Sequence, residues 1–182
     1  LASGDPADLA TGALEPFLYD IPGASTLVFL NGRFLSARST LAPLPAGVTV
    51  RHLAGALTAE STRLEGQLGH YARVDQDGFT ALNTALAGDG LYLHVAPGVE
   101  LSAPIHVVFA TDSRGRGTAT YPRNFIRLGR GSQAAVIESY VSLGQSAYLT
   151  NAVTEAVVED GAYLEHTKIQ RESERAFHVG TT

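Results

Sequence analysis

The feature that most constrains the fold is a run of β-type segments, joined by glycine turns, over residues 122–178. Gly90, Gly131 and Gly161 each open a similar phrase, DGLYLHV, RGSQAAVIESYVS and EDGAYLEHTKIQ. In each phrase a turn leads into a strand whose side chains point alternately to its two faces. In stacked β-coils, the inward-facing row of these side chains is buried. An open sandwich of hairpins gives the same alternation, so periodicity leaves both architectures open. The expected inward row is Ala135, Ile137, Val141 and Leu143.

The chain before residue 88 has a different character and is expected to form an α/β module. Residues 25–35 carry the apolar run TLVFL before Asn31-Gly32, a dipeptide that accepts positive φ, and predict a hairpin. Residues 1–26 have no clear period, apart from a short helical turn expected over residues 5–14. We therefore expect two domains, an N-terminal α/β module over residues 1–88 and a β region over residues 89–182.

Two helices are expected within the N-terminal module. Leucines at 53, 57, 64 and 68 form the stripe of an amphipathic helix over residues 53–68. A second helix begins after Asp77, a good N-cap, and ends at Gly88. It places Phe79, Leu82 and Leu86 on one face, which we expect to pack into the core.

Composition excludes several classes of function. The 182 residues are 45% hydrophobic and 17% charged, with a formal charge of −5, which disfavours nucleic-acid binding. The basic cluster of Arg114, Arg116, Arg123, Arg127 and Arg130 is expected to be a solvated face. No apolar run is long enough to span a bilayer, and the start does not resemble a signal peptide, so we expect no membrane association and a cytoplasmic location.

No motif for catalysis or metal binding is found, and we expect no catalytic, cofactor or metal site. The chain has no cysteine, which removes disulfides, thiolate ligands and Cys nucleophiles. Glu165 and His166 are adjacent on a strand and therefore point to opposite faces. We expect Glu165 to face solvent or to pair along the ladder, and His166 to be structural. Asn151 is expected to hydrogen-bond along the coil stack. None of the six histidines forms a close pair; they are His52, His70, His94, His106, His166 and His178.

The order of several phrases resembles the SufB/SufD family, and more closely the SufD side. From PRNFI the phrases continue as VIESYVS, TNAVTE, GAYLEHTKIQRES and AFH. Upstream, LVFLNGRF, LPAGV, FTALNTAL and DGLYLHVAPGVELSAPIHVVF match the N-terminal half of the family. The match runs from about Leu27 to the end of the chain.

The resemblance implies the first coils of a right-handed parallel β-helix. It also implies a non-catalytic scaffold component that acts with SufB-like and SufC-like subunits in iron–sulfur cluster assembly. The family's cluster-handling and SufC-docking residues lie in its C-terminal half, and no position here corresponds to them. Because family chains continue past the point that matches Thr182, we expect the β-coil over residues 160–182 to be uncovered and to self-associate.

Two other classes of protein fit the sequence less well. The first is a carbohydrate-active β-helix enzyme such as a polysaccharide lyase, which needs clustered acidic and basic residues. This chain offers a single lysine, Lys168, with scattered acids and 8% aromatic residues. The second, a small cupin-like metal barrel, requires close histidine pairs that this sequence lacks.

Overall fold

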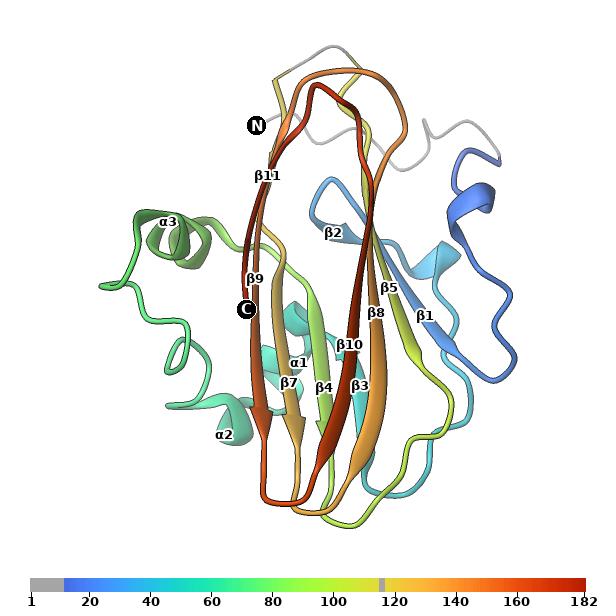
Figure 1. The fold of residues 1–182 in the computed structure, drawn as a ribbon, viewed down its shortest axis with the longest axis vertical. Coiled ribbons are helices and arrows are strands. Elements are labelled where there is room, and N and C mark those ends of the chain that lie inside the picture. The colour runs from blue at the N-terminus through green and yellow to red at the C-terminus, as the bar shows by residue number, and fades with distance from the viewer. Residues whose placement is uncertain (1–11, 115–116) are drawn as a thin grey trace.

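Strands dominate the computed structural model, which describes residues 12–114 and 117–182 and is 41% strand and 15% helix (Figure 1). The mainly β fold class is thereby confirmed. The strands are β1 Ser25–Leu30, β2 Arg33–Phe34, β3 Val48–His52, β4 Leu91–Val95, β5 Ile105–Thr111, β6 Ala119–Thr120, β7 Arg123–Leu128, β8 Gln133–Ser142, β9 Leu149–Val158, β10 Tyr163–Arg171 and β11 Phe177–Thr181. The helices are α1 Leu53–Ala59, α2 Ser61–Leu64 and α3 Gly78–Leu86, with 3-10 turns η2 Glu15–Phe17 and η3 Ser36–Arg38.

The strands form two sheets, and the chain alternates between them. Sheet A has the order β10-β8-β5-β1-β2, and sheet B has the order β11-β9-β7-β4-β3, with β6 also paired to β9. From β4 onward, each strand pair within the described ranges is parallel, whereas β1–β2 and β3–β4 are antiparallel. The β region is therefore not the sandwich of hairpins that periodicity alone had left open.

The two segments expected as separate domains share both sheets. β1 pairs with β5 in sheet A, and β3 pairs with β4 in sheet B, so hydrogen bonds join strands on either side of residue 88. The boundary at that residue stays a prediction. The turn expected over residues 5–14 lies mostly outside the described residues, which begin just before η2.

An apolar core fills the space between the sheets at the β1 and β4 end, with Leu27, Phe29, Leu93, Val107 and Ile126 among its members. The inward row of β8 differs from the expectation of Ala135, Ile137, Val141 and Leu143. Ala135 and Ile137 are partly exposed, while Val141 and Leu143 pack on the outer side of sheet A. The expectation failed because β8 carries apolar residues on both faces. The inward residues are Ala134, Val136, Glu138 and Tyr140.

Helices α1, α2 and α3 lie outside sheet B (Figure 1). The single helix expected over residues 53–68 is wrong, because the backbone leaves the helical region at Glu60, with φ −121° and ψ 25°. This break separates α1 from α2. Leu53 and Leu64 are buried, but Leu57 is exposed, so the four leucines do not form one stripe. None of the helices in the described ranges is long and apolar enough to cross a membrane.

Helix α3 begins where expected but faces the opposite way. The Asp77 carboxylate accepts hydrogen bonds from the backbone N–H groups of Phe79 at 2.8 Å and Thr80 at 3.2 Å, which confirms the N-cap. Phe79, Leu82 and Leu86, expected in the core, are 47%, 36% and 46% exposed. Thr80 and Asn83 are buried instead. The face that packs on sheet B is therefore polar.

Polar groups fix this orientation of α3. The Asn83 amide donates to the carbonyl oxygens of Pro122 at 2.9 Å and Asn151 at 2.7 Å. Asn151 donates its own side-chain amide to the carbonyl oxygen of Phe79 at 2.8 Å. Asn151 therefore does not bond along the sheet, as the sequence suggested, but outward to the helix.

The first hairpin forms at the Asn31-Gly32 turn, where the sequence predicts it. Asn31 and Gly32 have φ angles of 49° and 76°, and they connect β1 to β2. The Asn31 side chain also accepts from the backbone N–H of Asp112 at 2.9 Å and donates to its carbonyl oxygen at 3.1 Å. The hairpin is thereby joined to the end of β5.

The recurring glycines serve two different needs. Gly131 and Gly161 have φ angles of 67° and 68°, which favour glycine in the turns before β8 and β10. Gly90 instead lies against the neighbouring strand, where an added Cβ would be 1.9 Å from the carbonyl oxygen of Arg123. No side chain fits there unless β4 and β7 move apart.

We therefore predict that Gly90→Ala lowers the free energy of unfolding by about 1–3 kcal/mol, as overpacking against backbone does. Urea denaturation followed by circular dichroism measures this. Gly144→Ala is the matched control, because no heavy atom lies within 4 Å of its added Cβ. Equal stability of the two variants would contradict the close approach at Gly90.

Candidate functional site

The interior between the sheets becomes polar toward β10 and β11. Paired residues in sheet A show the change, since Leu27 pairs with Val107, Val107 with Glu138, and Glu138 with Lys168. In sheet B, Asn124 pairs with Thr154. The side chains of Asn124, Thr154 and Glu138 meet inside the fold, where all three residues are buried. An apolar core thus gives way to a buried hydrogen-bonded site.

Glu138 is the centre of this site and is 0% exposed. Its Oε1 accepts from Asn124 Nδ2 at 3.0 Å and Thr154 Oγ1 at 2.8 Å, and it lies 2.9 Å from His166 Nε2. Its Oε2 accepts from the Tyr140 hydroxyl at 2.7 Å. We call these five residues the Glu138 cluster. They come from β7, β8, β9 and β10 and tie the two sheets together.

Electrostatics keep this buried carboxylate ionised. Burial alone raises the pKa of Glu138, but the hydrogen bond and charge of His166, with the Tyr140 and Thr154 hydroxyls, outweigh it, so the pKa is lowered. Burial, followed by the Glu138 charge, raises the pKa of Tyr140 well above its usual value. Tyr140 therefore stays protonated and donates to Glu138.

A second carboxylate site, the Glu172 cluster, lies beside the first. Glu172 accepts from the Tyr148 hydroxyl at 3.1 Å, from Thr150 at 3.0 Å and from Gln170 at 3.3 Å, and it lies 2.7 Å from His178 Nδ1. Burial raises the pKa of Glu172, yet His178 and the other donors lower it overall. Burial likewise raises the pKa of Tyr148 to about 12.

Tyr140 and Lys168 connect the two clusters. The His178 ring meets the Tyr140 ring edge-on, with centroids 4.7 Å apart. The Lys168 ammonium lies 5.1 Å from the centroid of the same ring. Because Lys168 pairs with inward-facing Glu138 and its Nζ lies beside Gly180 of β11, its side chain crosses from sheet A to sheet B.

Two of the six histidines therefore belong to the polar interior, which sequence reasoning missed. His166 lies against Glu138, while adjacent Glu165 faces solvent, as expected. Nothing near Glu138 in the sequence identifies its partners, because Asn124, Thr154 and His166 are 14, 16 and 28 residues away. Only the stacking of strands brings them together.

The other histidines lie apart from this interior. His52 Nδ1 lies 2.8 Å from Asp89 Oδ2, and His70 packs edge-on against Tyr71. Burial, and then the charges of Arg63 and Arg127, lower the pKa of His94. Burial lowers the pKa of His106 to about 4, so this ring is neutral near pH 7. Its Nε2 lies 2.8 Å from Ser139 Oγ. Within the described ranges, no group of three or more His, Asp or Glu residues is placed to hold a metal ion.

A buried ion pair attaches the helical layer to the outer face of sheet B. Arg123 is 3% exposed and donates to Glu155, which also accepts from the backbone N–H groups of Gly69 at 2.8 Å, Tyr71 at 3.0 Å and Ala72 at 3.2 Å. The expectation that the arginine cluster is a solvated face is therefore wrong for Arg123. That residue lies under the helices because Glu155 supplies its counter-ion.

The remaining arginines of the cluster lie nearer the surface. Arg127 pairs with Glu159 at 2.6 Å and is about one-third exposed, whereas Arg130 and its partner Asp160 are both largely exposed. Arg114 pairs with Asp112 at 2.7 Å. Arg116 lies outside the described residues. Each of Arg114, Arg127 and Arg130 therefore lies beside a carboxylate.

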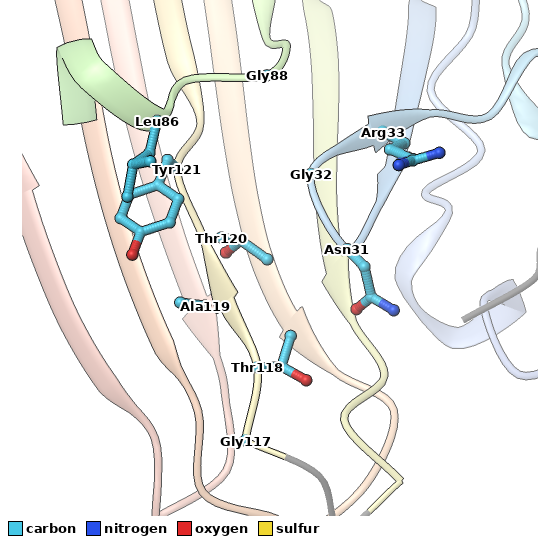
Figure 2. Close-up of a pocket in the computed structure, with 10 residues that line it drawn as sticks. All are labelled: Asn31, Gly32, Arg33, Leu86, Gly88, Gly117, Thr118, Ala119, Thr120 and Tyr121. Atoms are coloured by element: carbon cyan, nitrogen blue, oxygen red, sulfur yellow. The ribbon is translucent and has the colours of Figure 1, made fainter. Parts of the chain in front are cut away.

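A pocket of about 220 Å³ lies between the β1–β2 turn and residues 117–121, below the end of α3 (Figure 2). Figure 2 shows the Arg33 guanidinium directed away from Leu86 and Tyr121. The Asn31 amide is already bonded to the backbone of Asp112. Arg33 is therefore the one charged residue in the described lining, whereas the Glu138 cluster holds a buried carboxylate with four donors and is the stronger candidate site.

The family model described as SufBD protein N-terminal region matches residues 9–107. The model described as SUF system FeS cluster assembly, SufBD core domain, matches residues 109–182. The two matches meet within β5 and together cover nearly the whole chain.

Individual relatives are distant in sequence and longer. An iron–sulfur cluster assembly SufBD family protein of Synechocystis sp. is 29% identical over 96% of this chain and 40% of its own length. The chloroplastic protein ABCI7 of Arabidopsis thaliana is 27% identical over 76% of this chain and 30% of its own length. The iron–sulfur cluster assembly protein SufB of Bacillus subtilis is 27% identical over 62% of this chain and 24% of its own length. The chain therefore spans less than half of each of these relatives.

We predict that Glu138→Gln lowers the free energy of unfolding by about 2 kcal/mol at pH 7, because the buried carboxylate that accepts from four donors becomes an amide. The lowered pKa fixes the pH dependence. Stabilisation by Glu138 is present above the unfolded-state pKa, near 4.5, and is lost as pH falls through the lower folded-state pKa.

Urea denaturation at pH 7 and at pH 3 measures both effects. The stability difference between wild type and Glu138→Gln is expected to shrink at the lower pH. Glu165→Gln on the exposed face of β10 is the control and changes stability by less than about 0.5 kcal/mol. A Glu138→Gln difference that is absent at pH 7, or that grows on acidification, would show that Glu138 is not a stabilising ionised group.

Proposed function

Because two adjoining family models cover residues 9–107 and 109–182, the chain belongs to the SufB/SufD family, and we propose that it serves as a scaffold component in Suf iron–sulfur cluster assembly. The match to the N-terminal region model, followed along the chain by the match to the core domain model, carries the proposal. The printed names of the Synechocystis and Bacillus relatives, both iron–sulfur cluster assembly proteins, agree with it.

The scaffold is proposed to be the start of a right-handed parallel β-helix. Alternation of the chain between sheets A and B supports this architecture, as does the parallel pairing from β4 onward. Stacked glycine turns support it as well, since an added Cβ at Gly161 would lie 3.9 Å from Gly131 Cα. In such a solenoid each coil needs a neighbour to cover its interior.

The chain is further proposed to be SufD-like, cytoplasmic and non-catalytic, with SufB-like and SufC-like partners. Both carboxylates of the polar interior are fully engaged by hydrogen-bond donors, which suits a structural role better than acid–base chemistry. The 182 residues contain no cysteine for a cluster. Neither of the two family models and none of the three named relatives is described as a carbohydrate-active enzyme, so the lyase alternative has no support.

Co-purification tests the proposed partners. We expect a tagged product of the complete open reading frame that encodes this chain to retain the SufB and SufC proteins of the same genome. Residues 1–182 alone are the matched control and are expected to retain little SufC, since family resemblance assigns SufC docking to other regions. Failure of the complete product to retain either protein would contradict the scaffold proposal.

Self-association of the 182-residue chain is a separate prediction. β10 and β11 are the outermost strands of sheets A and B, so each leaves one row of backbone groups unpaired. Sedimentation of the wild-type chain at micromolar concentration is expected to show oligomers. The Ile169→Lys substitution in β10 is expected to weaken this self-association.

Leu82→Lys on the exposed face of α3 is the control and should leave these oligomers intact. A single 19.1 kDa species for the wild-type chain would contradict the prediction. Oligomers abolished by Leu82→Lys would instead assign the contact to α3.

A further inference from the structure

His52, the last residue of β3, carries an imidazole ring that is bound on one edge and open on another. Its Nδ1 lies 2.8 Å from Asp89 Oδ2, yet 34% of its side chain is exposed. His52 also lines a cavity of about 150 Å³ between β1 and β2 of sheet A and β3 of sheet B. This cavity belongs neither to the Glu138 cluster nor to the pocket near Arg33.

Asp89 determines which nitrogen of the ring carries the proton. Its Oδ1 accepts from the backbone N–H groups of Ala54 at 2.9 Å and Gly90 at 2.9 Å, which fixes the carboxylate in place. Because a carboxylate offers only acceptors, Nδ1 of His52 donates to Oδ2. The neutral ring therefore keeps its lone pair on Nε2.

The contacts that hold this ring leave Nε2 open. The Phe34 ring stacks on His52 with centroids 4.5 Å apart and an angle of 2° between the planes. An added Cβ at Gly55 would lie 2.6 Å from Nε2, 3.0 Å from Cδ2 and 3.1 Å from Cε1. All three ring atoms are this close, so Gly55 lies over the ring and not in line with the Nε2 lone pair. Because Asp89 covers the Nδ1 edge and the other contacts are with ring faces, the exposed part is the edge that carries Nε2.

The cavity beside this nitrogen suits a small apolar group. Gly55, which lies over Nε2, lines the same cavity, so the Nε2 end of the ring borders it. Besides His52 and Gly55, the lining consists of Leu27, Phe34, Leu41, Val50 and Arg51. Arg51 alternates with its neighbours in β3, and its guanidinium lies 3.9 Å from Glu60 on the other face of the strand. The walls that face a bound group are therefore mainly apolar.

We propose that His52 is a modification site that takes the acyl group of a small activated acyl compound onto Nε2, with the apolar chain of that group in the cavity. Histidine is one of the side chains that form covalent acyl products, and an adjacent base activates it. Nε2 bonds to the carbonyl carbon while the bond from this carbon to its leaving oxygen breaks, and the leaving group takes that electron pair. The Nδ1 proton passes through Asp89 to solvent, which leaves a neutral acyl-imidazole. This modification goes beyond the scaffold role and does not depend on it.

Diethyl dicarbonate is a suitable probe, because its ethoxycarbonyl product on histidine survives long enough for peptide mass spectrometry to locate it. His70 is the control within the same chain, since it is exposed and packs edge-on against Tyr71, whereas His52 is only partly exposed. Accessibility alone predicts faster modification of His70. We expect His52 of the 182-residue chain to react about tenfold or more faster than His70, because Asp89 acts as its base.

Two variants test the parts of the site. Asp89→Asn keeps an acceptor for Ala54 and Gly90 but removes the base, and it is expected to abolish the preference for His52 over His70. Leu41→Trp fills the cavity from a residue that is 54% exposed and is expected to remove most of this preference. Leu82→Trp adds the same ring on the exposed side of α3 and should leave both rates unchanged.

Several outcomes would overturn the proposal. The first is a His52 rate in the wild-type chain that does not exceed the His70 rate, and this comparison decides the matter if Asp89→Asn does not fold. The second is an unchanged His52 rate in an Asp89→Asn variant that circular dichroism shows to be folded. The third is a His52 rate that Leu41→Trp leaves unchanged, because the acyl group would then lie outside the cavity.

Discussion

The fold depends on keeping one ionised carboxylate, Glu138, inside it. A buried charge is tolerated only when donors surround it, and Glu138 has four, two from sheet B and two from sheet A. Moving β8 by one residue would turn this carboxylate outward and leave Asn124 and Thr154 without their acceptor. The cluster therefore fixes both the register of β8 and its position opposite sheet B.

A second carboxylate organises the outside of sheet B. Glu155 gathers Arg123 and three backbone N–H groups of residues 69–72, while Asn83 and Asn151 bond α3 to the sheet. Because these docking contacts are polar, the apolar side of α3 is left exposed. The same polar attachment leaves a hollow between α1 and α3 with Arg123 beneath it.

Local chemistry was predictable from the sequence, but the direction of side chains was not. The Asn31-Gly32 turn and the Asp77 cap depend on neighbouring residues only, and both are present. The inward row of β8 and the packing face of α3 were predicted from the rule that apolar residues face the core. That rule fails here because β8 is covered on both sides and Thr80 and Asn83 bury the polar face of α3. The interior site was missed for the same reason, since a carboxylate in VIESYVS is indistinguishable from a solvent-facing one.

Infrared spectroscopy tests the central claim, that Glu138 is a buried yet ionised carboxylate, most directly. The difference spectrum between wild type and Glu138→Gln, with isotope-labelled glutamate, isolates the bands of this side chain at pH 7. The account predicts carboxylate stretching bands and no carbonyl band of a protonated acid, because hydrogen bonds and His166 lower the pKa despite burial. A protonated carboxyl band at pH 7 would show instead that Glu138 is neutral, and the electrostatic account of the interior would be wrong.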